Sequence, residues 1–352
     1  MPTQEAVWTE QDTTPSAIEQ ALRELLSQRH AEDAGFVPAR ALNMVAFVEH
    51  AYTGEIANRM RGVGRYHASR LIVLSYDPRR QRIDARAMVA SEERRDGEIS
   101  PLRETVVVEI GPPHLDDLLT IIDPLVVSDM PTLLWSPHGH PEAVDALLPL
   151  AQAVLIDSVD EPDCAEALQR ASELARRAYV VDLAWLRSTP WRERIATAFD
   201  PPAMRRELTR ITRVEIGHHP ESAVAAMLLV GWLAARLRWR VEDGSGDGNG
   251  PSALLRSRRE QIEVSIVADQ RQLARGLADV RISTASGLRV GFKRGPGGLR
   301  TRRRSPSGAQ REWTILGASR GEGGILGEGI RQALLRDPTY QPALAVAEEI
   351  VR

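Results

Sequence analysis

The sequence predicts an α/β protein: an N-terminal domain with a mixed, mainly parallel sheet flanked by helices, then a second, smaller α+β domain. Two observations lead to this fold class. Short apolar segments typical of strands alternate with helical patterns as far as about residue 185, which favours a parallel sheet covered on both faces. After the sequence FDPP the alternation gives way to strands joined by turns. We therefore predict domains at 1–201 and 202–352, divided at Pro201 and Pro202.

In the first half, Pro15 stands at the start of a segment whose apolar residues Ile18, Leu22 and Leu25 recur at helical spacing. The strands expected after it are short and apolar, and those within 82–110 look antiparallel. Helices are expected at 16–28, 54–63, 112–122, 141–150 and 162–177, and strands at 39–48, 69–76, 82–90, 104–110, 131–135, 153–157 and 178–185.

In the second half, Thr189 and Pro190 fit an N-cap followed by proline at the first helical position, and Pro201 ends that helix. The apolar run at 223–235 reads as a buried helix, because spanning a bilayer takes about 20 residues. The remaining elements are a strand at 207–216, a helix at 221–237, a Gly-rich connection at 242–251, strands near 261–267, 277–284 and 288–294, and helices near 325–336 and 339–351.

The composition narrows the class of protein. Of 352 residues, 43% are hydrophobic, and the formal net charge of −3 favours neither nucleic acid nor a membrane surface. Cys164 is the only cysteine, so an intramolecular disulfide and a multi-cysteine metal site are excluded, and we expect Cys164 to begin a helix. The N-terminus lacks the features of a signal peptide. These observations favour a cytoplasmic protein without a membrane partner.

The segment DLAWLRSTPWRERIATAFDPP (182–202) concentrates tryptophan and arginine. Trp191, Ile195 and Phe199 share one face of the expected helix, while Arg192 and Arg194 point elsewhere. One interpretation is a buried aromatic face with solvated arginines. The other is a partner interface, because tryptophan and arginine dominate binding hot spots. We predict that Trp185 and Trp191 fix the domain junction and that Arg187, Arg192 and Arg194 are available for contact.

Residues 281–311 carry nine basic side chains and no acidic one. They are expected to form a hairpin with Leu288, Val290 and Phe292 facing inward and the basic side chains facing outward. One interpretation is a hairpin whose basic side is simply solvated. The other is docking to an acidic protein surface or an anionic ligand. Nucleic acid is disfavoured because Phe292 is the only aromatic side chain there for base stacking. The candidate docking residues are Arg289, Lys293, Arg294, Arg302, Arg303 and Arg304.

Motifs for catalysis or cofactor binding are weak. His138 with His140, and His218 with His219, lack the further ligands of a zinc site. The glycine-rich stretch GASRGEGGILGEG (317–329) matches neither nucleotide-binding fingerprint. We predict no catalytic residue, no metal and no cofactor.

Several segments together resemble the glucose-6-phosphate dehydrogenase assembly protein family, OpcA. They include PLVVSDMPTLLW (124–135), AVLIDSVD (153–160) and the tryptophan- and arginine-rich segment 182–202. The resemblance implies a non-enzymatic bacterial factor that binds glucose-6-phosphate dehydrogenase, favours its active oligomer and raises its activity, which would support the pentose phosphate pathway and NADPH supply. It adds Trp135 to the candidate partner-binding residues. Structural roles are implied for the motif residues Asp182, Trp185, Thr189, Pro190, Trp191 and Asp200.

Two departures from the family pattern concern single residues. Ser136 stands where many relatives carry a second tryptophan, and Cys164 alone cannot form an internal dithiol switch. Two other functions stay open: a sugar-phosphate-binding sensor or enzyme, suggested by HASR (His67–Arg70), and a nucleic-acid-binding protein acting through 281–311. Whether the chain forms a homo-oligomer is also left open.

Overall fold

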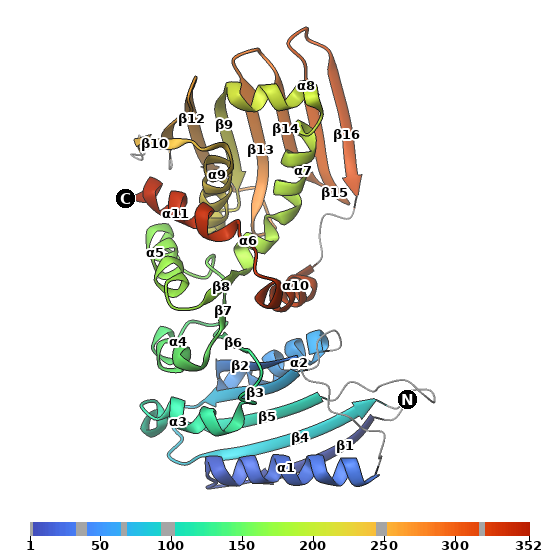
Figure 1. Ribbon diagram of the computed structural model, residues 1–352, viewed down its shortest axis with the longest axis vertical. Coiled ribbons are helices and arrows are strands. Elements are labelled where there is room, and N and C mark those ends of the chain that lie inside the picture. The colour runs from blue at the N-terminus through green and yellow to red at the C-terminus, as the bar shows by residue number, and fades with distance from the viewer. Residues whose placement is uncertain (1–2, 33–40, 65–68, 93–102, 244–251, 317–320) are drawn as a thin grey trace. The chain divides into compact units, whose positions relative to one another are not determined.

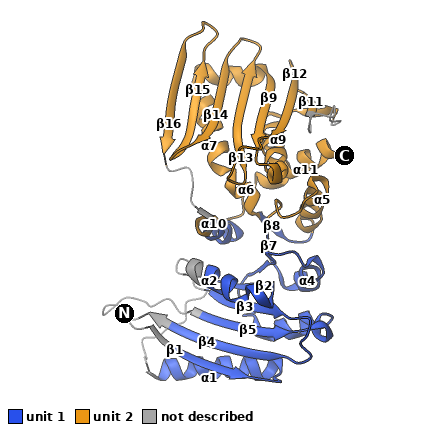
Figure 2. Ribbon diagram, turned by 180° about the vertical axis from the view of Figure 1, so that it is seen from behind, with its two compact units in different colours: residues 1–156, 177–181, 326–334 blue, residues 157–176, 182–325, 335–352 orange. Residues whose placement is uncertain are grey.

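The computed structural model describes residues 3–32, 41–64, 69–92, 103–243, 252–316 and 321–352 (Figure 1). The chain forms two compact units, and each contains segments that are distant in sequence (Figure 2). Unit 1 comprises 1–156, 177–181 and 326–334, and unit 2 comprises 157–176, 182–325 and 335–352. The elements on the two sides of Pro201 and Pro202 therefore lie in the same unit, whereas we placed a domain boundary there.

The sheet of unit 1 is mixed and mainly parallel, which confirms the predicted fold class. Its strand order is β1-β4-β5-β3-β2-β6-β7-β8; β5, β3, β2, β6 and β7 pair in parallel, and β4 and β1 are added antiparallel. Counted along the chain, the strands from β2 onward, leaving out β4, have the 3-2-1-4-5-6 order of a doubly wound sheet. The strands are β1 Thr3–Glu10, β2 Leu42–Glu49, β3 Ser69–Tyr76, β4 Asp84–Glu92, β5 Arg103–Ile110, β6 Thr132–Trp135, β7 Ala153–Ile156 and β8 Tyr179–Asp182.

Helices cover this sheet. In β2 every residue from Leu42 to Val48 is buried, which requires cover on both faces. Helix α1 packs against β1 and β4, and α2 packs against β2 and β3. The helices are α1 Pro15–Glu32, α2 Thr53–Gly64, α3 Leu118–Ile122 and α4 Pro141–Leu147.

Strand β1 was not predicted. Its outer side chains are exposed, with Val7 45% accessible, so its apolar alternation is weak. It forms because its backbone pairs with β4 along the whole strand, with Val7 opposite Met88. Such an edge strand is determined by its partner more than by its own pattern.

Unit 2 contains a second eight-stranded sheet, of order β10-β11-β12-β9-β13-β14-β15-β16. Its neighbours are antiparallel except for the parallel pair β9 and β12. The strands are β9 Ile211–His218, β10 Arg240–Asp243, β11 Ser252–Arg256, β12 Gln261–Ala268, β13 Leu277–Thr284, β14 Arg289–Gly295, β15 Gly298–Arg304 and β16 Gln310–Leu316. The helices are α5 Cys164–Ala175, α6 Leu183–Arg187, α7 Thr189–Phe199, α8 Pro202–Arg205, α9 Ala223–Leu237, α10 Gly321–Leu335, of which 326–334 belong to unit 1, and α11 Tyr340–Val351.

Helices lie over one face of this sheet, as α7, α8 and α9 show in Figure 1. The inner residues Val280, Val290 and Phe292 are at most 1% exposed, and side chains on the opposite face are largely accessible. Residues Pro220–Leu237 are long and apolar enough to cross a membrane by length and composition alone, but 61% of them are buried in the protein. Helix α9 is thus the core helix of unit 2, as the sequence predicted.

Further predicted boundaries, and further strands, differ from the structure. The strand expected at 178–185 ends at Asp182, because the Asp182 side chain caps α6. The strand expected at 207–216 begins at Ile211, after a 3-10 turn at Arg206–Arg210. Helix α7 has its N-cap at Ser188, one residue before the predicted cap at Thr189. Strands β10 and β11 flank the Gly-rich connection and were not predicted.

Candidate functional site

A buried carboxylate, Asp182, stands where the motif segment begins, at the end of β8. It is 1% exposed and accepts hydrogen bonds from Ser158 Oγ at 2.6 Å, Ala184 N at 2.9 Å and Tyr340 OH at 3.1 Å. Burial and, to a smaller extent, the charge of Asp157 raise its pKa to about 6, although hydrogen bonds from Ser158 and Ala184 oppose the rise. Asp182 thereby ties α6, the loop after β7 and α11 together, which agrees with the structural role implied for it.

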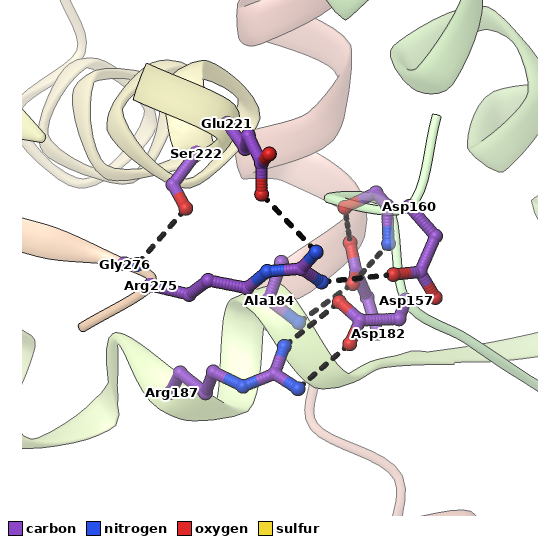
Figure 3. Close-up of polar contacts among 10 residues, drawn as sticks. Asp157, Asp160, Asp182, Ala184, Arg187, Glu221, Ser222, Arg275 and Gly276 are labelled. Atoms are coloured by element: carbon purple, nitrogen blue, oxygen red, sulfur yellow. Dashed lines mark hydrogen bonds and ion pairs between the residues drawn. The ribbon is translucent and has the colours of Figure 1, made fainter. Parts of the chain in front are cut away.

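Two arginines beside Asp182 are neutralised by carboxylates of the same unit (Figure 3). Arg187 binds Asp157 in a bidentate pair, with Nη1–Oδ1 at 2.8 Å and Nη2–Oδ2 at 2.7 Å. Arg275 lies 3.3 Å from Asp160 and 3.1 Å from Glu221. Burial and the charge of Asp157 raise the pKa of Asp160 to about 6, against the opposing charges of Arg275 and Arg187.

The space enclosed by this cluster is small. The cavity has a volume of about 10 Å³ and is lined by Val159, Ala184, Arg187, Ser188, Ala225, Arg275, Gly276 and Leu277. That volume holds about one water molecule, whereas small-molecule sites typically occupy roughly 300–1,000 Å³. The cluster is therefore a satisfied polar network within unit 2, with no room for a nucleotide or a sugar phosphate.

Sequence reasoning missed most of this network. Asp157 ends the strand expected at 153–157 and Asp160 follows it, and acidic residues at the carboxyl end of a parallel strand could have drawn attention to them. Arg275 lies in a loop before β13 and gave no sequence signal. Only the fold brings it beside residues more than 100 positions earlier, such as Asp160 at |i−j| = 115.

Arg192 is buried, and the expectation that it faces solvent is wrong. Its Cζ lies 3.4 Å from the ring centroid of Trp185, and its guanidinium donates to Trp185 O, Ser188 Oγ and Thr189 Oγ1 at 2.7–2.9 Å. Burial lowers its pKa to about 9, which still leaves it protonated at neutral pH. On the same cluster Trp185 Nε1 donates to Asp337 at 2.9 Å. Arg192 is thus a cation–π partner inside unit 2.

The side chains of the other candidate contact residues are also not exposed as a partner interface would require. The Arg187 side chain is 15% exposed and paired, and Arg194 is half-buried, with its Nε hydrogen-bonded to no described residue. Trp135, the final residue of β6 in unit 1, is 4% exposed. The structure gives none of these three a freely accessible side chain, so their assignment to a partner interface loses its geometric basis.

The remaining residues of the motif lie in the core or at the ends of helices. Trp185 and Trp191 are each 2% exposed, and both lie within unit 2, whereas we predicted that they fix a domain junction. Pro190 lies in the first turn of α7, and Asp200, at its C-terminal end, is exposed and pairs with Arg205 at 2.6 Å. These placements explain the motif as a folding unit of short helices.

Cys164 begins α5, as predicted. Burial raises the pKa of its thiol to about 12, and the charge of Asp163 contributes to the rise. The thiol is therefore almost entirely protonated near neutral pH, a poor nucleophile and a poor redox sensor.

The basic hairpin forms as predicted, with Leu288, Val290 and Phe292 buried. Arg289, Lys293, Arg302 and Arg304 are exposed on the face opposite these apolar residues. Arg294 and Arg303 alternate with them and are half-buried, so the prediction that they face outward with the others is wrong. The Nε of Arg294 donates to Leu277 O at 3.1 Å, and burial lowers its pKa.

Histidines lie after β2 and β6 of unit 1, where a doubly wound sheet places its ligand crevice. The His140 ring centroid is 5.0 Å from that of Phe47, and the His138 ring centroid is 4.3 Å from that of Tyr52. The turn after β2 reads EHAYTG and lacks the glycines of a dinucleotide fingerprint. In unit 2, His218 is buried with Nδ1 2.7 Å from His219 O. The described residues contain no group of three side chains suited to a metal ion.

The sugar-phosphate hypothesis relied on the HASR sequence. His67 lies outside the described residues, whereas Arg70 is buried and pairs with Glu104 at 2.7 Å. It also donates to Leu125 O at 2.9 Å. The structure therefore gives Arg70 a structural partner instead of a free charge for phosphate.

Two protein families match successive parts of the chain. Residues 61–173 match the family described as glucose-6-phosphate dehydrogenase subunit N-terminal domain, and residues 178–344 match the corresponding C-terminal domain. The chain belongs to the OpcA family. The resemblance found in the motifs is thus confirmed, and the two matches divide between 173 and 178, far from our boundary at 201.

Curated OpcA relatives match over part of their length. A protein of Synechocystis named "Putative OxPP cycle protein OpcA" is 31% identical over 124 residues, and one of the same name from Nostoc punctiforme is 28% identical over 179 residues. The matches cover 34% and 47% of this chain, and 26% and 38% of the relatives. The chain therefore aligns with less than half of either relative.

Among solved structures, apo scyllo-inositol dehydrogenase from Lactobacillus casei superposes with a TM-score of 0.45 and 11% identity. The superposition covers 90% of this chain and 95% of that one. A similarity of this size identifies neither a ligand nor an activity.

Proposed function

We propose that this OpcA-family chain is a non-enzymatic assembly factor and allosteric activator of glucose-6-phosphate dehydrogenase. It would act in the cytoplasm and support the oxidative pentose phosphate pathway and its supply of NADPH. The observation that carries the proposal is the match of both dehydrogenase-subunit domain families, in order, to 61–173 and 178–344. The names of the curated relatives, which refer to the OxPP cycle, point to the same pathway.

The geometry of unit 2 supports a role in binding over one in catalysis. In the polar cluster beside Asp182, Arg187 and Arg275 are already paired with carboxylates, and the cavity beside them holds about one water. A catalytic cluster needs space for a substrate next to groups that can change their partners. This cluster instead fixes elements of the fold.

Activation without catalysis requires differential affinity. A protein that binds two forms of an enzyme equally well does not change the equilibrium between them. The factor must therefore bind the active oligomer more tightly than the inactive form. Coupling of this kind is typically about 1–3 kcal/mol, which corresponds to a change of roughly 5- to 150-fold in affinity.

The test combines the purified chain with the dehydrogenase encoded in the same genome. We expect the rate of NADPH formation and the mass measured by light scattering both to rise with added chain and to saturate at a fixed ratio. An unrelated protein of similar charge is the control. If neither quantity changes, the proposal is wrong. Calorimetric titration with glucose 6-phosphate, 6-phosphogluconate and NADP in the absence of the dehydrogenase checks the sugar-phosphate alternative.

A further inference from the structure

The sheet of unit 2 has one face that its helices leave uncovered, and we name it the cationic face. Figure 2 views the unit from the side opposite to that in Figure 1, where the helices lie in front of the strands. Alternation along the strands assigns to this face the cations Arg213, Arg281, Arg289, Lys293, Arg300, Arg302 and Arg304 and the carboxylates Glu215, Glu263, Asp279 and Glu312. Positive charge is in excess, although the chain as a whole has a net charge of −3.

The register between β14 and β15 places like charges directly opposite each other. Arg289 pairs across the strands with Arg304, and Lys293 pairs with Arg300. Like charges in directly opposed positions destabilise a sheet. The fold does not need these residues to be cationic, because the buried side of the same hairpin is formed by Val290 and Phe292.

Some cations of this face are already neutralised. Arg302 and Arg300 lie 3.0 and 3.4 Å from Glu312, and Arg281 lies 3.1 Å from Asp279. Arg213 pairs with Glu263. Within the described part of the chain, Arg289, Lys293 and Arg304 form no ion pair. Lys293 does act at a distance on Asp269. The pKa of Asp269 is lowered mainly by a hydrogen bond from Arg271 N, and the charge of Lys293 contributes to the lowering. Arg289, Lys293 and Arg304 are thus the described cations of the face without an ion pair, although Lys293 lies opposite Asp279 in the register of β13 and β14.

A glycine leaves backbone uncovered in the middle of the face. Gly291 lies between Arg289 and Lys293 on β14, opposite Arg281 on one side and Arg302 on the other. A side chain there would meet only Arg281 Cγ at 3.9 Å and Arg302 O at 4.0 Å, so packing does not require glycine. Glycine inside a strand weakens it and often marks a place where another backbone approaches closely.

The mixture of charges favours a protein over a nucleic acid. Glu215, Asp279 and Glu312 stand among the cations, where a phosphodiester chain would meet them with repulsion. Trp313 on β16 belongs to the opposite side of the strand and carries Arg311 5.6 Å from its ring, so it offers no open stacking surface. A protein surface can match both signs of charge at once.

We propose that the cationic face, centred on Arg289, Lys293 and Arg304, docks an acidic surface of the partner dehydrogenase. The inference rests on the proposed function and names the surface of this chain that carries it out. Docking places carboxylates of the partner against the three cations, which removes the repulsion that the free protein tolerates.

The experiment compares two double variants of the full chain with equal changes in charge. Arg289→Glu with Lys293→Glu reverses the centre of the face. Arg258→Glu with Arg259→Glu reverses two exposed arginines in the turn between β11 and β12, away from that centre. Affinity for the dehydrogenase is measured by calorimetry at two salt concentrations. We expect the first variant to lose affinity at least roughly tenfold, and the second to resemble wild type.

The outcomes separate this inference from the proposed function. Equal binding by wild type and the Arg289/Lys293 variant, with the variant shown by circular dichroism to be folded, overturns the docking surface and leaves the proposed function intact. Failure of wild type to bind the dehydrogenase overturns both. Binding of duplex DNA or single-stranded RNA by wild type, lost in the same variant, assigns the face to nucleic acid and also overturns the inference.

Discussion

Arg192 shows how a single residue can depart from its helical pattern. Along α7 it lies beside the exposed Glu193, away from the apolar stripe of Trp191 and Ile195, so periodicity predicts exposure. The preceding helix α6 ends only a few residues earlier and places the ring of Trp185 against its guanidinium. The arginine is 8% exposed because two short helices meet at Ser188.

We predict that Arg192→Glu strongly destabilises unit 2, so a loss of activation in this variant would not report on partner contact. The new carboxylate would lie buried beside Asp337, which already faces Trp185 Nε1. An uncompensated buried charge costs about 3–5 kcal/mol in free energy of unfolding. Ala196→Glu places the same charge on an exposed position of α7 and should change stability by less than about 0.5 kcal/mol. Urea unfolding of both variants gives the comparison; equal stability would contradict the buried position of Arg192.

Asp182 should make stability depend on pH. Its pKa is raised to about 6, so the folded state binds a proton more tightly than the unfolded state does. Its contribution is present at low pH and is lost as the pH rises from about 4 to about 6. Asp182→Asn removes this titration, so the stability of the variant relative to wild type should increase over that interval by up to roughly 3 kcal/mol.

Asp337 provides the contrast for this measurement. Burial alone would raise its pKa, but hydrogen bonds from Thr339 and Trp185 and the charge of Arg192 hold the pKa below its ordinary value. Its contribution is therefore lost as the pH falls, and Asp337→Asn should give a difference of opposite sign. Unfolding by urea across the acidic range measures both. A relative stability of Asp182→Asn that does not vary with pH would contradict the raised pKa.

At the scale of the element, the β14–β15 hairpin combines a well-formed apolar side with a self-repelling polar side. Val290, Phe292 and Leu299 are buried beneath it, which fixes its register. The turn between the strands contains Gly297 at φ +77°, in the left-handed region that favours glycine. The hairpin therefore folds despite the cations opposed across its outer face.

Arg289→Glu should stabilise the protein. The substitution converts the Arg289–Arg304 cross-strand pair into one of opposite charge and should raise the free energy of unfolding by about 0.2–1 kcal/mol. Arg289→Gln, which only removes the charge, should lie between this variant and wild type. Chemical denaturation measures the series. A loss of stability in Arg289→Glu would show that the opposed arginines do not repel each other in the fold.

At the scale of the whole molecule, each unit is completed by segments far apart in the chain. In unit 2, α11 packs against α9 and α5 and buries Tyr340, Leu344 and Ile350. Helices α9 and α11 approach so closely at Gly231 that a Cβ atom there would lie 2.1 Å from Ala343 O. The C-terminal helix is thus an integral part of the core of unit 2.

Gly231→Ala should destabilise the protein although alanine favours helices. Relief of the overlap with Ala343 must move α11 and costs about 1–3 kcal/mol in free energy of unfolding, more than the gain in helix propensity. Gly323→Ala is the control, because a Cβ in this exposed part of α10 meets nothing within 4 Å and should stabilise by about 0.4–1 kcal/mol. Thermal melts of both variants distinguish them; stabilisation by Gly231→Ala would contradict the close helix contact.

The sequence by itself determined the features that arise from local periodicity. These include the fold class, the buried helix α9 and the inward side of the basic hairpin. Each depends on the alternation of apolar and polar residues within one element, which the chain carries locally. Family membership likewise followed from ordered local motifs.

Only the tertiary structure decided where charges find their partners. Arg192, Arg187 and Arg70 look like available cations in the sequence, and the fold places each against a ring or a carboxylate. Strand pairing conversely left Arg289 opposite Arg304. The cost of burying or opposing a charge depends on atoms within a few ångströms, and these come from distant positions in the chain. The candidate contact surface therefore moved from the tryptophan-rich motif to the open face of the second sheet.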